Sequence, residues 1–408
     1  MNQWKRIIKN SIMISLASLP LFAYNNCGSP GFETVSVSED LASTAGDPSL
    51  PNQPSTPTTT LPPVTQPPNP PTGNKVEIFV ASGHQGRTIM SCDEGQTWIN
   101  DRSDNPNAIC WGPDNTDPNY AECDHSPSAG TGIEYANGYF YTTFGWGYGG
   151  TVRRSSDGAN WQVLKSGGWG GGLAIVQNSL MLLWDKWPIT HDWGSTWTNT
   201  WNTTQLSGFN ARRLTKAGNK LIAMGGTTGI AISSDLGVNW SRPASFQPAW
   251  GDGVEKGRGG AVEGNGVIVI LSTKTASPNI LYASRSTDQG QTWTAVEVAT
   301  GSGFSWSSLI FANGKFMSWG GGKMWTSTDG ASWTGTAMNI GNVPGPIARN
   351  SKGVFTLIKA VWANYYNLQY AYRSTDGVNW TKLSATAFPG GHPLNFILSG
   401  EVDASACP

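Results

Sequence analysis

The stretch Ser286–Trp293, which reads STDQGQTW, recurs six more times along the chain with small changes. The other copies are SCDEGQTW (91–98), SSDGANW (155–161), THDWGSTW (190–197), SSDLGVNW (233–240), STDGASW (327–333) and STDGVNW (374–380). Their starting positions are 35 to 64 residues apart, which brackets the length of one four-stranded propeller blade. Seven copies at this spacing predict seven similar sheets.

Each copy has the composition of a tight turn between two strands. An aspartate at the third position has a short carboxylate that can accept hydrogen bonds from backbone N–H groups of the turn, and the glycine supplies a positive φ. The closing tryptophan begins the next strand and can pack between neighbouring sheets. We interpret the aspartates as structural rather than catalytic or metal-binding, because seven equivalent active sites are not expected in one chain: Asp93, Asp157, Asp192, Asp235, Asp288, Asp329 and Asp376.

The pattern Ser/Thr-x-Asp-x-Gly-x-Thr-Trp resembles the Asp box of the bacterial neuraminidase repeat, the mark of the sialidase-like β-propeller family. The resemblance covers most of residues 75 to 401. It implies an all-β, seven-bladed propeller with its Asp boxes on the face opposite the active site. The family includes sialidases, some xyloglucan-degrading enzymes and many propellers without enzymatic activity, so the resemblance marks the fold more sharply than the function.

The N-terminal 74 residues have a composition unlike the rest. Lys5, Arg6 and Lys9 precede an apolar run at 12–23, which predicts a secretory signal peptide over residues 1–26. Cys27 directly follows and resembles a bacterial lipoprotein acylation site. Residues 27–74 are rich in Pro, Ser and Thr and predict a solvated linker without a core. We therefore expect an exported bacterial protein, attached to the outer membrane through the lipid anchor only, or located in the periplasm or at the cell surface.

The composition limits the classes of molecule that we expect the protein to bind. The chain has 408 residues, a formal net charge of -1, 13% charged residues, 51 Gly and 20 Trp. This profile is typical of a turn-rich β protein, and the absence of a basic excess argues against nucleic acid. We expect a monomer without a cofactor or a resident metal. The partners expected are a glycan or an envelope protein.

Residues 75–408 predict seven blades, with the first one closed by the C-terminal strand at 394–400. A closed ring protects the sheet edges that an open one would expose. The Asp boxes join third to fourth strands, so they share a face with the turns between first and second strands. The second-to-third loops and the connections between blades form the opposite face, where we expect binding.

The four cysteines after Cys27 predict two disulfides, since an even count outside the cytoplasm favours pairing. Cys92 lies in the first box, and Cys407 follows the closing strand of the same blade, so we expect them to be bonded. Cys110 and Cys123 share the long 102–130 connection and form the second predicted pair. A zinc site with His125 is the alternative, and the segment 114–117 is either a calcium loop or a plain turn.

Aromatic residues beside glycines are frequent in the loops of the expected binding face. Flat rings of this kind stack on the apolar faces of sugars, whereas the alternative for about half of them is packing between blades. The predicted aromatic binding residues are Trp146, Tyr148, Trp169, Trp187, Trp250, Trp319, Trp362 and Tyr365. Trp201 and Tyr366 belong to the same loops.

Arginines near the innermost strands predict a second feature. Arg212 or Arg213, together with Arg258 and Arg349, can reach the central channel and clamp a carboxylate, the device that the resemblance to sialidases implies. The alternative is ordinary pairing with acidic residues, for which Asp252, Glu255 and Glu263 are available.

We assign no catalytic residue from the sequence. A sialidase-like hydrolase would need a Tyr–Glu pair, for which Tyr365 or Tyr366 with Glu255 are available, and hydrolysis by two carboxyl groups would use Asp185 and Asp252. The family's Arg-Ile-Pro motif is missing, because residues 394–397 read LNFI in its place. The hypothesis is a binding propeller, with a sialidase-like glycoside hydrolase and an assembly scaffold for membrane complexes as alternatives.

Overall fold

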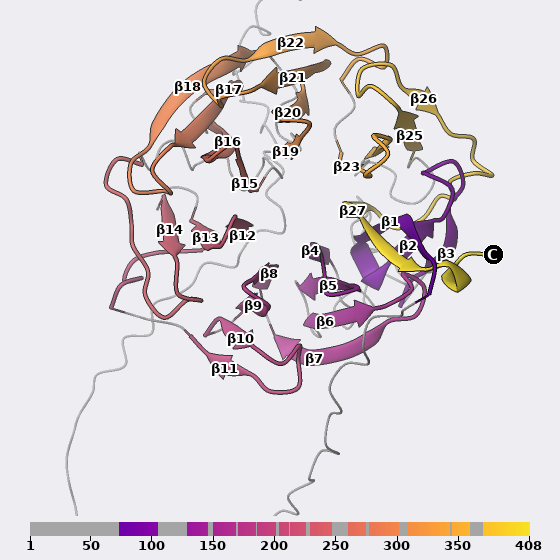
Figure 1. Ribbon diagram of the computed structural model, residues 1–408, viewed down its shortest axis with the longest axis horizontal. Helices are drawn as coiled ribbons and strands as arrows, with labels where there is room; N and C mark the ends of the chain where they lie inside the picture. Colours follow the sequence, from indigo (N-terminus) through magenta and orange to yellow (C-terminus); the bar gives the residue numbers. More distant parts are fainter. Residues whose placement is uncertain are drawn as a thin grey trace, which may run out of the picture. The chain divides into compact units, whose positions relative to one another are not determined.

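Seven antiparallel sheets form a ring in the computed structural model (Figure 1). The structure describes residues 73–104, 129–145, 150–168, 170–184, 186–200, 204–211, 213–225, 229–246, 260–274, 277–301, 309–342, 345–359 and 370–408. Within these residues, six sheets have four strands and one has three. The predicted seven-bladed β-propeller is confirmed.

The first four blades follow the predicted order. Blade 1 contains β27 (Leu394–Asp403), β1 (Lys75–Gly83), β2 (Thr88–Ser91) and β3 (Ile99–Arg102), with the 3-10 turns η1 (His84–Gly86) and η4 (Ala404–Ala406) beside it. Blade 2 contains β4 (Ala129–Ala136), β5 (Tyr139–Gly145), β6 (Gly150–Ser155) and β7 (Gln162–Gly168). Blade 3 contains β8 (Gly170–Val176), β9 (Ser179–Trp184), β10 (Pro188–Thr190) and β11 (Thr198–Asn199). Blade 4 contains β12 (Arg213–Ala217), β13 (Lys220–Met224) and β14 (Ile230–Ser233).

The remaining three blades have four strands each. Blade 5 contains β15 (Ala261–Gly264), β16 (Val267–Lys274), β17 (Ser277–Ser286) and β18 (Thr294–Thr300). Blade 6 contains β19 (Leu309–Ala312), β20 (Lys315–Gly320), β21 (Lys323–Ser327) and β22 (Thr334–Ala337). Blade 7 contains β23 (Ile347–Arg349), β24 (Phe355–Lys359), β25 (Tyr370–Ser374) and β26 (Thr381–Lys382).

Blade 4 departs from the sequence prediction at its outer edge. A fourth strand was expected from Trp240 onward, but in the described part of this blade the only pairing beyond β14 is an isolated bridge between Ile232 and Ser241. Pro243 follows two residues later, and a proline has no N–H group to donate to a continuing ladder. The outer strand therefore stops at its first bridge.

The first and last strands of the propeller pair with each other in blade 1. β27 pairs antiparallel with β1 over the whole length of both strands, from Lys75 opposite Asp403 to Gly83 opposite Leu394. The disulfide Cys92–Cys407 joins the same blade, with its two Cα atoms 5.8 Å apart. Both the closing strand and this disulfide were predicted from the sequence and are confirmed.

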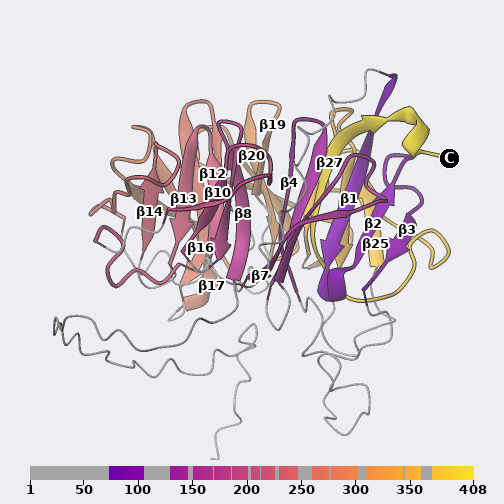
Figure 2. The same cartoon turned by 90° about the horizontal axis from the view of Figure 1, so that it is seen from below.

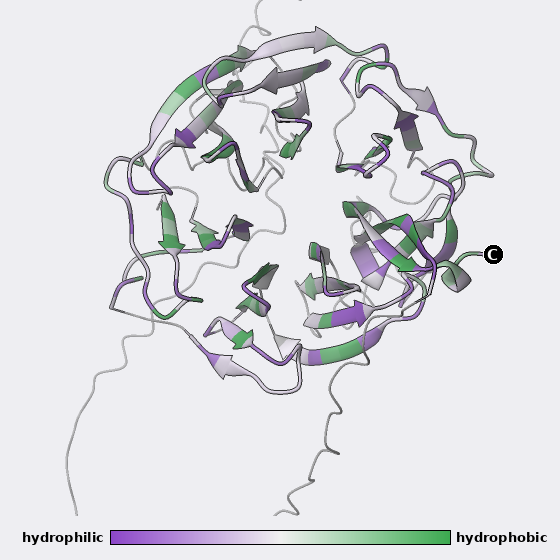
Figure 3. Ribbon diagram, viewed as in Figure 1, coloured by the Kyte–Doolittle hydropathy of each residue, from purple (hydrophilic) through white to green (hydrophobic). Residues whose placement is uncertain are grey.

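Hydrophobic side chains hold the ring together at the contacts between blades. The described residues form seven buried clusters, and each cluster combines side chains of two neighbouring blades. Hydrophobic residues occur in strands all around the ring (Figure 3). One of them joins Ala348 and Ile358 of blade 7 to Phe79 and Ile397 of blade 1. Since every blade buries both of its faces in this way, no blade has a core of its own.

The Asp boxes close the turns as their composition predicts. In the blade 5 box, Ser286 Oγ donates a hydrogen bond to Asp288 Oδ1 and accepts one from the Gly290 N–H, both at 2.8 Å. The bond from the first hydroxyl to the aspartate recurs in all seven boxes at 2.7 to 3.0 Å. All seven box glycines have a positive φ, between 72° and 102°. The boxes are therefore structural turns.

The part of the chain that the structure describes includes no helix that is both long and apolar enough to cross a membrane.

Candidate functional site

The strands run between two faces of the ring (Figure 2). We call the face with the Asp boxes and the first-to-second hairpins, such as Asn137–Gly138, the box face. On the opposite face, the strand ends flank the segments in which the sequence places most of the predicted binding residues. Examples are Gly145 and Gly150 on either side of 146–149, and Lys359 and Tyr370 on either side of 360–369.

Two of the predicted aromatic binding residues are buried. Trp187 is 5% exposed and Trp319 is 3% exposed, so neither can stack on a ligand at the surface. Their burial between blades fits the alternative prediction, in which these tryptophans pack in the core of the ring. The other aromatic binding residues that were predicted lie outside the described residues: Trp146, Tyr148, Trp169, Trp250, Trp362 and Tyr365.

The surroundings of the two buried tryptophans explain their position. The Trp187 ring meets the blade 4 box tryptophan, Trp240, edge to face at 5.0 Å in the cluster between blades 3 and 4. Trp319 reaches the blade 7 box, where its Nε1 donates to the Gly377 carbonyl at 2.9 Å. Buried indoles with a partner for the N–H group are typical structural tryptophans.

The two arginines of the predicted channel set that the structure describes differ in their contacts. Arg349 donates to the Asn350 carbonyl at 3.3 Å and lies over the Phe355 ring in its own blade. Arg213 begins β12 at the opposite-face end, and no hydrogen bond or ion pair joins its guanidinium to another described residue. Burial lowers the pKa of Arg213 to about 10 against the attraction of Glu134. Arg212 and Arg258 lie outside the described residues.

An ion pair that the sequence analysis missed links two inner strands. Lys216 Nζ of β12 lies 2.7 Å from Glu134 Oε2 of β4, so the pair connects blades 4 and 2 past the inner strand of blade 3. The Glu134 side chain is 19% exposed, and burial raises the pKa of its carboxyl group while Lys216 opposes the shift. The available signal was one acidic residue in the innermost strand AGTGIEYA and two basic residues in the innermost strand RLTKA, but neither strand indicates the other as its partner.

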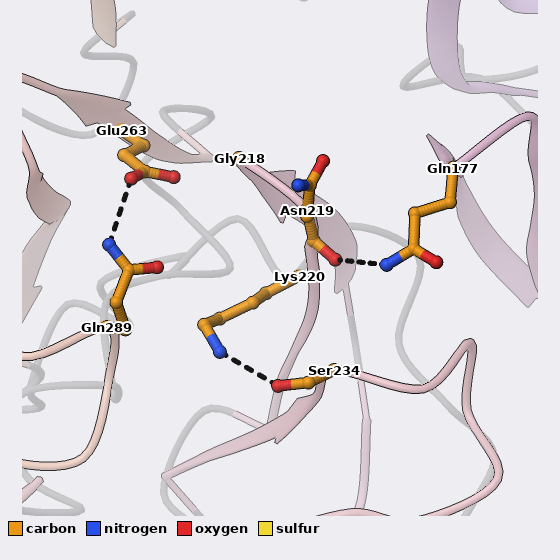
Figure 4. A pocket seen from close by; sticks show the side chains of 7 residues that line it. All are labelled: Gln177, Gly218, Asn219, Lys220, Ser234, Glu263 and Gln289. Atoms are coloured by element: carbon orange, nitrogen blue, oxygen red, sulfur yellow. Dashed lines mark hydrogen bonds between the residues drawn. The ribbon is translucent and has the colours of Figure 1, made fainter.

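A polar pocket of about 370 Å³ opens on the box face where blades 3, 4 and 5 meet (Figure 4). Glu263 accepts a hydrogen bond from Gln289 at 3.1 Å, and no arginine among the described residues pairs with it. Lys220 Nζ donates to Ser234 Oγ at 2.8 Å, and Gln177 donates to the Asn219 carbonyl at 3.3 Å. All of these side chains lie on first-to-second hairpins, inner strands or Asp boxes.

The described residues form no group of three or more His, Cys, Asp or Glu side chains with the spacing of a metal site. The residues considered for hydrolysis, Asp185, Asp252, Glu255, Tyr365 and Tyr366, lie outside the described residues. The same is true of Cys27, the predicted pair Cys110–Cys123, His125 and the segment 114–117.

Comparisons with known proteins identify similar folds. No family model matches the chain, and no curated protein is significantly similar in sequence. Among solved structures, YCF48 from Cyanidioschyzon merolae is 13% identical over 63% of this chain and 85% of its own, with a TM-score of 0.45. The GH74 enzyme of Niastella koreensis is 19% identical over 62% of this chain and 45% of its own, with a TM-score of 0.41.

PorZ, a bacterial surface component of the type-IX secretion system of Porphyromonas gingivalis, is 12% identical. The match covers 74% of this chain and 37% of that one, with a TM-score of 0.41. These likenesses are too distant to assign a function. By its own strands and turns, the chain is a seven-bladed β-propeller built on Asp boxes.

Proposed function

We propose that this protein is an exported, membrane-tethered binding propeller that recognises a glycan through the face opposite its Asp boxes. The observation that carries the proposal is topological. The strand ends that flank the aromatic and glycine-rich segments, among them Gly145, Gly150, Lys359 and Tyr370, belong to a single face of a closed ring. The aromatic residues that the sequence places in these segments are of the kind that stacks on sugar rings.

The guanidinium of Arg213 favours a glycan that carries an acidic group. This guanidinium has five N–H donors, the residue is partly buried, and the guanidinium makes no hydrogen bond or ion pair within the described part of the chain. A carboxylate or sulfate of the ligand would satisfy these donors at the end of β12 on the same face. The disulfide Cys92–Cys407 is consistent with a location outside the cytoplasm.

A glycan array followed by titration of the best ligand tests the proposal. Trp146→Ala, Trp169→Ala and Trp362→Ala should each weaken binding by about tenfold, the loss expected for one stacking contact. Arg213→Met should remove the preference for acidic over neutral glycans, and Arg102→Met on the outer strand of blade 1 is the matched control. Unchanged affinity in all three tryptophan variants rejects the site.

The same assays separate the alternatives. A stable protein partner without any glycan affinity would replace the glycan by an envelope protein and support the scaffold hypothesis. Release of reducing sugar from a bound glycan would instead establish a hydrolase.

A further inference from the structure

The geometry points to a second binding site, for a neutral saccharide, in the polar pocket on the box face. This site does not depend on the proposed function, because it lies on the other face of the ring and uses other residues. Its lining residues are Gln177, Gly218, Asn219, Lys220, Ser234, Glu263 and Gln289.

The pocket forms because one position of the blade repeat carries a different kind of side chain in blade 5. Tyr135, Glu263 and Phe311 occupy equivalent positions in blades 2, 5 and 6. Each lies on the innermost strand of its blade, in the second residue pair counted from the first-to-second turn. The two aromatic rings cover a glycine of the preceding blade, since a Cβ at Gly400 or Gly264 would collide with them. In the groove between blades 4 and 5, the carboxylate of Glu263 covers Gly218 instead.

This exchange leaves a hollow lined by hydrogen-bonding groups. Lys220 and Glu263 carry opposite charges, yet neither takes part in an ion pair with another described residue, and each has only a neutral partner, Ser234 or Gln289. Three amide side chains complete the lining, and no aliphatic or aromatic side chain contributes to it. The pocket therefore offers donors and acceptors in a balanced set with no net charge.

A neutral saccharide matches this chemistry. One sugar hydroxyl can donate to the Glu263 carboxylate and another can accept from the Lys220 ammonium group, and further hydroxyls fit the amides of Asn219 and Gln289. A phosphate would face the carboxylate, and an apolar ligand would leave the polar groups unsatisfied. The volume of about 370 Å³ lies at the small end of ligand pockets, the size suited to one or two sugar units.

The test uses calorimetric titration of the full chain with glucose, galactose, N-acetylglucosamine and their β-linked disaccharides. At least one of them should bind. Glu263→Gln and Lys220→Met should each weaken that binding by about tenfold, as for the loss of a hydrogen bond to a charged group. Lys315→Met is the matched control, because Lys315 holds the register position of Lys220 in blade 6 and lies outside the pocket.

A variant that fills the pocket keeps the test decisive. Ser234→His should abolish binding and still fold, because His191 occupies the same position of the blade 3 Asp box. Arg213→Met at the opposite-face end of β12 and Trp146→Ala in the proposed glycan site should leave this binding unchanged, so the two sites fail or succeed separately. The inference is overturned if none of the saccharides binds at its highest soluble concentration, or if binding survives Ser234→His.

Discussion

Cys92 and Cys407 are bonded to each other across a sequence separation of 315 residues, and the bond joins the first Asp box to the residue after η4, just beyond the closing strand. It therefore fastens the contact on which the ring depends, the pairing of β27 with β1. We expect the double variant Cys92→Ser/Cys407→Ser to lose about 2–5 kcal/mol in the free energy of unfolding, because the bond restricts the unfolded chain. Urea unfolding of the parent protein with and without reductant measures the effect of the bond. An equal unfolding midpoint in both conditions would refute a locking role.

Arg87 forms a second fastening of the same blade. Its guanidinium donates to both carboxylate oxygens of Asp101 at 2.7 and 2.8 Å and to the His392 carbonyl at 2.6 Å, just before β27 begins. The side chain is 1% exposed, so Arg87→Met leaves Asp101 without its partner and should cost about 3–5 kcal/mol. Chemical denaturation of this variant is compared with Arg102→Met, an exposed neighbour expected to change stability by less than about 0.5 kcal/mol. Equal losses in the two variants would contradict the assignment.

The Asp boxes predict how stability depends on pH. Side-chain and backbone hydrogen bonds from Thr292 lower the pKa of Asp288 to about 2, and backbone hydrogen bonds from Ser332 and Ala331 do the same for Asp329. A lowered pKa in the folded state contributes stability that is complete above the unfolded value near ~3.9 and is lost as the pH falls towards about 2. The melting temperature should therefore drop between about pH 4 and pH 2.

The variant Asp288→Asn tests this origin, because an amide keeps an acceptor oxygen and does not titrate in this range. It should be less stable than the parent protein at neutral pH and should show a shallower fall on acidification. Parallel melting curves of the two proteins would show that the box carboxylates do not cause the acid loss.

Replacing Trp319 should lower the stability of the protein and leave its glycan binding unchanged. Trp319→Ala removes a buried indole and its hydrogen bond to Gly377, which should cost about 3–5 kcal/mol. Val238→Ala, at a side chain that is 62% exposed, serves as the control. Thermal unfolding and glycan titration of both variants test this expectation. A stable Trp319→Ala protein with weakened binding would restore its predicted role as a ligand contact.

The pair Glu134–Lys216 should couple two blades that are not neighbours. Lys216→Met leaves Glu134 without its cation, and we expect a loss of about 1–2 kcal/mol at neutral pH, reduced because the Lys216 side chain is 36% exposed. Because the pKa of Glu134 is raised in the folded protein, the protonated form of Glu134 contributes to the free energy of unfolding. This contribution is complete below the pKa of the group in the unfolded chain and is lost as the pH rises through its pKa in the folded protein. The loss should therefore shrink near pH 4.

The double variant Glu134→Gln/Lys216→Met should recover most of that stability, since it removes the carboxylate together with the ammonium group that pairs with it. A double-mutant cycle by urea unfolding at both pH values gives the coupling energy. Additive losses at neutral pH would show that the contact does not stabilise the ring.

The sequence alone determined the ring, the number of blades and the way that it closes. This was possible because an Asp box is a local device: Ser286, Asp288, Gly290 and Trp293 satisfy one another within eight residues, so the turn can be read without knowledge of its neighbours. The pairing of Cys92 with Cys407 followed from the same reading, since blade count and strand order place both at one blade.

Only the tertiary structure decided which side chains face outward. Trp187 and Trp319 belong to loops and strand ends whose composition suits a binding surface, but the adjacent blades cover them. The contact of Glu134 with Lys216 and the pocket around Glu263 each need residues from two or three blades. The reason is physical: hydrogen bonds within a turn depend on sequence spacing, whereas burial depends on the surface that another blade presents.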